Sequence, residues 1–286
     1  MDCLKKITIA LAVAGGLIAV TVCIAAIPHS AAHTWTGQES GKPQLVAEAS
    51  AIPGGTPEAS ESESIEGRTG AWEPQAEVIN VALATLPSSA MIEVPVIDQL
   101  PELFNGCEVT SLAMLLEAAG SPVDKMELAE RVAKDRTPLV RNEDGAIESW
   151  GNPDVGFVGD MTGETDGYGV YHGPIFQLLA EILPRRAADL TELPFDELLT
   201  AVADGRPVVI WTNINFTPET LMETWQSDAG PVQMSWYEHA VLLVGYDDEY
   251  MYVNDPFDGA AAKPIERDTL ISSWLQMGSQ AVTYRK

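Results

Sequence analysis

The stretch LFNGCEVTSLAMLLEAAG, residues 103–120, decides the fold that the sequence predicts. Its apolar residues recur at intervals of three and four: Val109, Leu112, Ala113, Leu116 and Ala119. This spacing predicts a helix with one face turned to a core, which Gly120 is suited to end. Asn105 and Gly106 predict a turn immediately before it. Cys107 should therefore open the helix.

Cys107 is the only cysteine after the N-terminal leader, because the other two are Cys3 and Cys23. No intramolecular disulfide is then expected in the exported part, although exported proteins often have them. One interpretation of Cys107 is that it serves only as a small, buried apolar residue. The other is a nucleophile, because unpaired N–H groups and the dipole at a helix start favour a thiolate. With an imidazolium nearby, such thiols have pKa values of about 3.5 to 7.5.

The first 90 residues differ from the rest. Residues 1–32 predict a signal peptide or an N-terminal membrane anchor, since two lysines precede an uncharged apolar run from Ile7 to Ile27. The lysines predict a cytoplasmic N-terminus, so the rest should be extracellular or on the cell surface. Residues 33–90, rich in Pro, Gly, Ser, Ala and Glu, predict a disordered acidic spacer. Residues 91–286 are long enough for one domain.

The formal net charge is -26, which argues against nucleic acid or an anionic membrane surface as a partner. Membrane contact is expected only through the N-terminal hydrophobic segment. Two acidic stretches, residues 141–148 and 160–167, lack the ligand spacing of an EF-hand loop. We interpret them as a solvated acidic face, and we expect no metal, no cofactor and a monomer.

The remaining pattern indicates an α+β domain, because helices are followed by antiparallel strands. The predicted helices cover residues 107–119, 121–135, 173–183 and 194–205, and the predicted strands cover 91–100, 206–214 and a hairpin at 239–256. Ser121 is expected to cap the second helix. The irregular stretch 137–170 is too long for an ordinary connection, so we predict that it forms a rim or lid.

The predicted hairpin brings a histidine to a carboxylate. If its turn centres near Asp248, His239 falls opposite the region of Asp255. A carboxylate in this position orients an imidazole and fixes its tautomer. His172, the other histidine of the domain, has no carboxylate at hairpin distance, and we expect it to be structural or to line a cleft.

Four motifs resemble the C39-like peptidase family in its stand-alone bacterial form: VPVIDQ at 94–99, NGCEVTSLAMLL at 105–116, HAVLLVGYD at 239–247 and VNDP at 253–256. The resemblance implies a papain-like fold, with N-terminal helices packed on a C-terminal antiparallel sheet. It also implies that Cys107 is the nucleophile, His239 the general base and Asp255 the orienting carboxylate. Gln99 would complete an oxyanion hole together with the backbone N–H of Cys107.

One departure from the family is Glu108, which stands where many members have glycine and places a negative charge beside the thiol. The resulting prediction is an exported thiol hydrolase, a cysteine peptidase that cleaves peptides or proteins outside the cell through an acyl-enzyme. An acyltransferase or deamidase with the same triad stays open, as does a catalytically silent surface binding module. Trp236 and Tyr237 could floor a substrate groove.

Overall fold

The computed structural model describes residues 12–13, 16–17, 86–220 and 222–286. The first two pairs form short antiparallel strands, β1 (Ala12–Val13) and β2 (Gly16–Leu17). The other residues of the expected leader, and the expected spacer up to residue 85, lie outside the described residues. Within the described residues, no helix combines the length and the apolar character needed to cross a membrane.

A seven-stranded antiparallel sheet forms the centre of the domain, in the order β14-β13-β12-β9-β15-β8 with β3 beside β12. Its strands are β3 (Ala90–Met91), β8 (Ala187–Asp189), β9 (Val208–Asn213), β12 (Glu238–Tyr246), β13 (Tyr250–Asp255), β14 (Ala260–Glu266) and β15 (Ala281–Tyr284). The sheet and the helices around it confirm the predicted α+β class.

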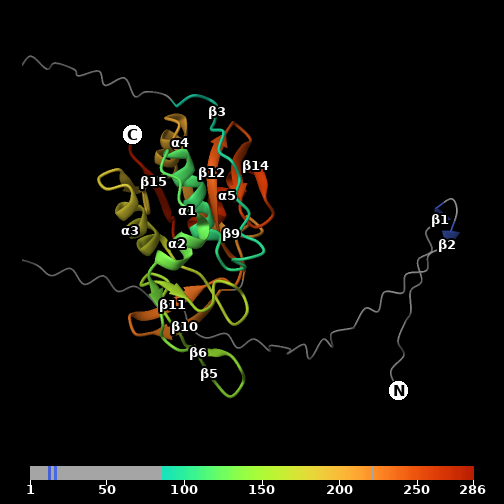
Figure 1. Ribbon diagram of the computed structural model, residues 1–286, viewed down its shortest axis with the longest axis vertical. Coiled ribbons are helices and arrows are strands. Elements are labelled where there is room, and N and C mark those ends of the chain that lie inside the picture. Colours follow the sequence, from blue (N-terminus) through green and yellow to red (C-terminus); the bar gives the residue numbers. More distant parts are fainter. Residues whose placement is uncertain (1–11, 14–15, 18–85, 221) are drawn as a thin grey trace, which may run out of the picture. The chain divides into compact units, whose positions relative to one another are not determined.

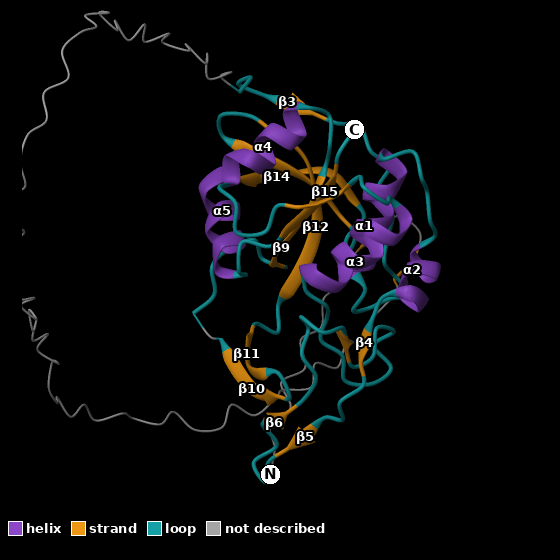
Figure 2. Ribbon diagram, turned by 90° about the vertical axis from the view of Figure 1, so that its left-hand side faces the viewer, coloured by secondary structure: helices purple, strands orange, loops and turns teal. Residues whose placement is uncertain are grey.

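Five described helices cover the two faces of this sheet: α1 (Cys107–Ala118), α2 (Lys125–Arg131), α3 (His172–Ile182), α4 (Phe195–Ala203) and α5 (Arg267–Gln276). Figure 1 labels the five helices, and Figure 2 shows α1, α2 and α3 on one side of the sheet, and α4 and α5 on the other. Successive side chains of a strand point to opposite faces. In β9, Val209 accordingly packs in the core beneath α1 and α3, whereas Val208 and Ile210 pack against α4 and α5.

A second, smaller sheet lies beyond one end of the central sheet (Figure 2). It has the order β11-β10-β6-β5 and contains β5 (Val140–Arg141), β6 (Ile147–Ser149), β10 (Glu223–Ser227) and β11 (Gly230–Met234). The rings of Trp150 and Trp225 are 5.6 Å apart in its core. Two further strands, β4 (Lys134–Asp135) and β7 (Phe157–Val158), pair in parallel. The first half of the predicted rim therefore contains two short strands of the smaller sheet, β5 and β6.

The start of α2 was predicted wrongly. Asp124, not Ser121, is its N-cap, and the Asp124 carboxylate accepts a hydrogen bond of 2.8 Å from the backbone N–H of Met126. Gly120 has a φ of +71°, so the chain turns sharply after α1. An extended segment then intervenes, which delays the helix by one turn.

Trp274 on α5 provides a test of the core between α5 and α4. It is 1% exposed, its ring lies 5.0 Å from that of Phe195, and its Nε1 donates to the Gln280 carbonyl. We expect Trp274→Ala to lower the free energy of unfolding by about 3 to 5 kcal/mol, the cost of a large buried cavity. Leu275 on the same helix is 56% exposed, so Leu275→Ala is the matched control, with a change within about 0.5 kcal/mol. Chemical denaturation measures both, and a loss below about 1 kcal/mol for Trp274→Ala would contradict the packing.

Candidate active site

Cys107 is the first residue of α1, as predicted, and is 6% exposed. The residue before it, Gly106, has no room for a side chain, because an added Cβ would lie 2.6 Å from Cβ of Leu103. One turn further along, the hydroxyl of Ser111 donates to the carbonyl of Ala240 at 3.0 Å. This bond fixes the start of α1 against β12, one residue beyond His239.

His239 and Asp255 are each 2% exposed and form a buried pair, with Nε2 2.8 Å from Oδ1. The hairpin register explains it, because Leu242 pairs with Asn254 and Leu243 with Val253, which brings the start of β12 to the end of β13. The predicted juxtaposition is present. Because Nε2 of His239 faces the carboxylate, Nδ1 is the nitrogen left for other chemistry.

Asp255 has a second partner, since its Oδ2 lies 2.9 Å from Nζ of Lys263. Burial by itself raises the pKa of Asp255, but the hydrogen bond and charge of His239, together with Lys263, lower it more. The net pKa is far below the usual range, so the carboxylate stays ionised. The imidazole is also flanked by the rings of Phe216 and Phe257, each with its centroid 6.3 Å away.

Cys107 and His239 line one pocket of about 220 Å³. The other residues that line it are Gln99, Phe104, Asn105, Gly167, Tyr168, Ile214, Trp236, Tyr237, Glu238 and Phe257. Trp236 and Tyr237, 45% and 55% exposed, therefore border the groove as predicted. Sulfur, imidazole and an aromatic wall thus meet at one concave site.

Gln99 lines the same pocket and is 1% exposed. Its Nε2 donates to the carbonyls of Leu103 at 3.1 Å and Phe104 at 2.7 Å, so both amide hydrogens are in use. Its Oε1 is buried without a hydrogen-bond partner among the described residues. Stabilising an oxyanion would require one N–H to leave its carbonyl, and this role stays a prediction.

Two glutamates adjoin the thiol. Glu108 is fully buried, accepts a 2.6 Å bond from the backbone N–H of Val170 through Oε1, and faces Sγ of Cys107 with Oε2 at 3.5 Å. Glu238 comes directly before His239 on β12. The ligand atoms of Cys107, Glu108 and Glu238 all lie within 4.8 Å of one another, a spacing that could also hold a cation. Glu108 was recognised from the sequence, but Glu238 was not. The signal that could have indicated Glu238 is its position directly before His239.

Burial raises the pKa of the Cys107 thiol well above its ordinary value, and the charges of Glu108 and Glu238 raise it further. A backbone hydrogen bond from Ala240 lowers it, but by less. Burial also raises the pKa of Glu108 to about 7, and burial followed by the charge of Glu108 raises that of Glu238 well above its usual range. The expectation of an acidic thiol is thus wrong for the free protein, in which the thiol is neutral.

The pH dependence of Cys107 alkylation tests this finding. We expect the rate with iodoacetamide, followed by mass spectrometry of the Cys107 peptide, to keep rising above the pKa of about 8.5 of an ordinary thiol. Glu108→Gln should move the profile to lower pH, because it removes a negative charge from beside the sulfur. Glu117→Gln, at the exposed end of the same helix, is the control and should not move it. A plateau below about pH 7.5 in the wild type would contradict burial of a neutral thiol.

The second half of the predicted rim borders the pocket. Asn105 donates from its backbone to the Met161 carbonyl at 3.0 Å and from Nδ2 to the Asp160 carbonyl at 2.7 Å. Gly167 and Tyr168 line the pocket directly. The rim prediction therefore holds for Gly167 and Tyr168, which line the pocket.

His172 lies elsewhere. It opens α3, where its Nδ1 is 3.0 Å from Oδ2 of Asp189, a carboxylate from a strand outside the hairpin. His172 borders a separate pocket of about 310 Å³ whose lining does not include Cys107. The cleft-lining expectation therefore holds only for that pocket.

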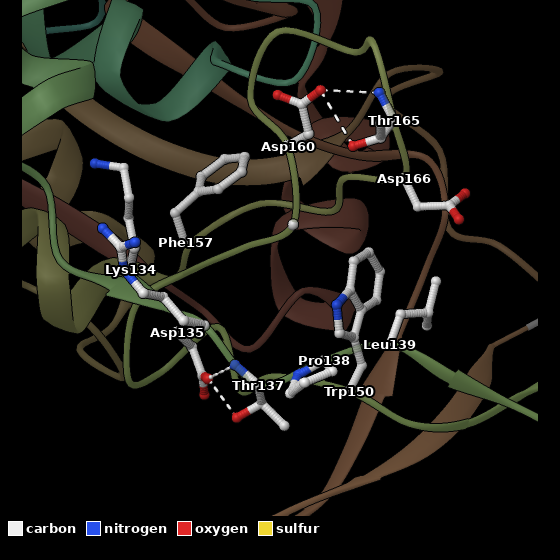
Figure 3. Close-up of a pocket in the computed structure, with 12 residues that line it drawn as sticks. Lys134, Asp135, Thr137, Pro138, Leu139, Trp150, Phe157, Asp160, Thr165 and Asp166 are labelled. Atoms are coloured by element: carbon white, nitrogen blue, oxygen red, sulfur yellow. Dashed lines mark hydrogen bonds between the residues drawn. The ribbon is translucent and has the colours of Figure 1, made fainter.

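A larger pocket of about 490 Å³, shown in Figure 3, lies between β4 and the 157–166 segment. Its lining does not include Cys107, His239 or Asp255. The figure shows two of its carboxylates bonded to threonines of their own loops, Asp135 to Thr137 and Asp160 to Thr165. These bonds shape loops, so we place the chemistry in the smaller pocket.

Comparison with known proteins bears on the family and the fold. Residues 91–282 match the Peptidase_C39 like family. The chain is 42% identical over 186 residues to the uncharacterized protein YvpB of Bacillus subtilis strain 168, which covers 65% of this chain and 71% of YvpB. The crystal structure of a Bacillus anthracis protein assigned to the C39-like peptidases has 45% sequence identity and a TM-score of 0.65. That match covers 70% of this chain and 98% of the other.

Proposed function

Because this chain belongs to the Peptidase_C39 like family, as its motifs predicted, we propose that it is a cysteine peptidase acting through Cys107, His239 and Asp255. The family, and the fold shared with the C39-like peptidase of Bacillus anthracis, support the peptidase assignment. The single observation that carries the proposed mechanism is the buried 2.8 Å contact between His239 and Asp255 at the pocket that also holds Cys107. A nucleophile, a base and an orienting group are the parts that covalent catalysis requires.

The proposed reaction begins from a neutral thiol. As Sγ of Cys107 attacks the peptide carbonyl, Nδ1 of His239 takes the thiol proton, because Nε2 is engaged by Asp255. The imidazolium then gives this proton to the departing amine as the C–N bond breaks. Water attacks the resulting thioester, passes a proton back through His239, and releases the acid and the free thiol.

The negative oxygen of the tetrahedral intermediate needs donors. The backbone N–H of Cys107 is available in principle, because the N-cap Gly106 offers no side-chain cap to the first turn of α1. Gln99 is the proposed second donor, and it would act only after releasing Leu103 or Phe104. Mutants of other enzymes that lose one such donor lose about 10²- to 10³-fold in kcat.

Hydrolysis and acyl transfer share the thioester, so the products distinguish them. We would incubate the whole protein with a diverse peptide mixture in H₂¹⁸O, with and without added glycine amide, and analyse the products by mass spectrometry. A peptidase gives new C-termini that carry ¹⁸O, whereas a transferase gives glycine amide adducts and a deamidase converts glutamine or asparagine side chains to acids. Protein pretreated with iodoacetamide is the control. The absence of any product that depends on the free thiol would refute the proposal.

We further propose that the substrate is met outside the cell, on the strength of the N-terminal sequence. Lys5 and Lys6 precede an apolar run that ends at Ile27, a pattern that places the following chain across the membrane. Protease accessibility of the C-terminal domain on intact cells would test this. Protection until lysis would contradict it.

A further inference from the structure

Glu238 has an unsatisfied carboxylate oxygen beside the nucleophile. Its Oε1 is buried and has no hydrogen-bond partner among the described residues. Glu238 has no ion pair within this part of the chain either, and the nearby Lys263 is held by Asp255 at 2.9 Å and Asp258 at 2.7 Å. A buried acceptor without a donor is costly, which indicates that a donor arrives from outside.

The carboxylate borders the pocket that contains Cys107 and His239. A second acceptor in that pocket lacks a partner, Oε1 of Gln99, whose side chain is 1% exposed. The pocket, at about 220 Å³, is smaller than the roughly 300 Å³ of typical small-molecule sites, so it suits a single side chain. Tyr168 and Trp236 line it as well, and aromatic faces attract cations.

Glu108 is not among the residues that line this pocket, but it lies next to Glu238 and acts on the pocket through its charge. The carboxylates of Glu108 and Glu238 converge on Gly169, where an added Cβ would lie 2.6 Å from Oε1 of the first and 2.8 Å from Oε2 of the second. Gly169 thus leaves the room in which the two acids meet. Two carboxylates this close repel one another, and a cation between or beside them relieves the repulsion.

We propose that the Glu108–Glu238 pair is a subsite for the cationic side chain of a lysine or arginine on the acyl side of the cleaved bond. The inference rests on the proposed peptidase function and adds a substrate class to it. The acyl side follows from position, because the carboxylates lie within 4.8 Å of the sulfur to which the acyl group becomes attached. Glu238 supplies the unpaired oxygen, and Glu108 is anchored by the backbone of Val170.

The test uses covalent probes, so that it does not depend on knowing the substrate. Two pairs of N-acetylated peptidyl acyloxymethyl ketones are compared on the whole protein. In the first pair, one probe has arginine next to the ketone and the other has its uncharged isostere citrulline at the same position. In the second pair, arginine and citrulline are compared at the preceding residue of the peptide. The second-order rate of Cys107 labelling is measured by peptide mass spectrometry. We expect arginine to react about 10- to 100-fold faster in at least one pair, the size of one charge-assisted hydrogen bond.

Variants locate the preference. Glu238→Gln keeps the size of the side chain, and we expect the arginine-to-citrulline ratio to fall to within about 2-fold of unity, because the charge-assisted bond is lost. Glu223→Gln removes an exposed charge on β10 outside the pocket and should leave the ratio unchanged, which controls for the acidity of the whole protein. A ratio that survives in Glu238→Gln would overturn the assignment.

The other outcomes are distinct. If Cys107 is labelled but arginine and citrulline react equally in both pairs, the subsite is refuted while the peptidase proposal stands. If no probe labels Cys107, the proposed function fails and the subsite fails with it. A further pair of probes tests whether the cation that binds is a side chain or the amino terminus of the substrate. Both are leucine ketones, one with a free and one with an acetylated amino terminus. A preference for the free amine that is lost in Glu238→Gln, with none for arginine, would overturn the side-chain assignment.

The preference should also depend on pH. Burial raises the pKa of Glu108 to about 7 and raises that of Glu238 further, so the pair is protonated in acid and gains negative charge as pH rises through 7. The arginine-to-citrulline ratio should rise with it. The other titratable groups that face the pair are Cys107, Tyr168, Tyr171, and His239 with its partner Asp255. A charge on any of these groups acts on arginine and not on citrulline, so the pH profile is compared with that of Glu238→Gln, and the part of the rise that this variant loses is assigned to the pair. A rise that is the same in both proteins, or a wild-type ratio flat from pH 5 to 9, would count against the subsite.

Discussion

Replacing Cys107 with alanine should lower kcat/KM for peptide hydrolysis by about 10⁴-fold or more, the scale on which other covalent catalysts lose activity when the nucleophile is removed. Without sulfur no thioester forms, and His239 has no thiol proton to accept. The measurement is the release of a fluorescent group from the best peptide found in the product search. The rate is divided by the concentration of folded protein. The variant is compared only if its thermal unfolding midpoint equals that of the wild type.

The control must show that the loss reflects chemistry and not folding. Thr110→Ala removes a hydroxyl that bonds the Gly106 carbonyl at 2.7 Å, one turn away on the same helix and pointing away from the pocket lining. We expect it to retain kcat within a few-fold while losing about 1 kcal/mol of stability. If Cys107→Ala retained more than about 1% of wild-type activity, another group would be the nucleophile. If it retained the full biological effect without hydrolysis, the surface binding module would be favoured.

The parts of the site that the sequence predicted are those set by local patterns. The three-four spacing after Gly106 was enough to place Cys107 at the start of α1, although every residue of that helix from Cys107 to Leu116 is buried and not one face alone. The hairpin could be aligned from its acidic turn near Asp248, because residues at equal distances from the turn face each other, and this placed His239 opposite the region of Asp255. The family resemblance then assigned roles that local patterns alone could not.

The acidity of the thiol could not be predicted, because it depends on tertiary burial. The helix-start argument considered only the dipole, whereas in the folded chain desolvation is the largest effect on the pKa of Cys107. Glu238 adds a charge from a strand more than a hundred residues away in sequence, and nothing near Cys107 indicates it. The same applies to Gln99, whose bonds to Leu103 and Phe104 arise from how its loop closes.

The second sheet was missed for a different reason. Its strands β5, β6, β10 and β11 are two to five residues long, and β10 pairs in parallel with β6 across some 75 residues. Strands this short show no usable alternation, so the acidic, glycine-rich composition of 137–156 was the only signal. That composition correctly indicated a departure from ordinary loops, and only the later part of the stretch borders the pocket.

Asp255→Asn should lower kcat by about 10³- to 10⁴-fold with little change in KM, because an amide cannot hold His239 as the carboxylate does. With Asp255 ionised, Nε2–H of His239 donates to Oδ1 and Nδ1 is left free to accept the thiol proton. An asparagine that donates its own N–H to Nε2 would instead place the ring hydrogen on Nδ1, where the base must be. Steady-state kinetics on the same fluorogenic peptide measure the effect.

Asp258→Asn is the matched control. Both acids bind Nζ of Lys263, Asp255 at 2.9 Å and Asp258 at 2.7 Å, but only Asp255 contacts His239. Loss of the Lys263 contact alone should therefore leave kcat within about 3-fold, since exposed ion pairs contribute little.

Because the folded pKa of Asp255 is depressed, its stabilising contribution is complete above its unfolded pKa of about 3.9 and is lost only as pH falls further. Any rate loss between pH 5 and 7 must then come from a group other than Asp255. A loss below 10-fold in Asp255→Asn would mean that the rings of Phe216 and Phe257 suffice to orient the imidazole, and the carboxylate would then have only a structural part in the reaction.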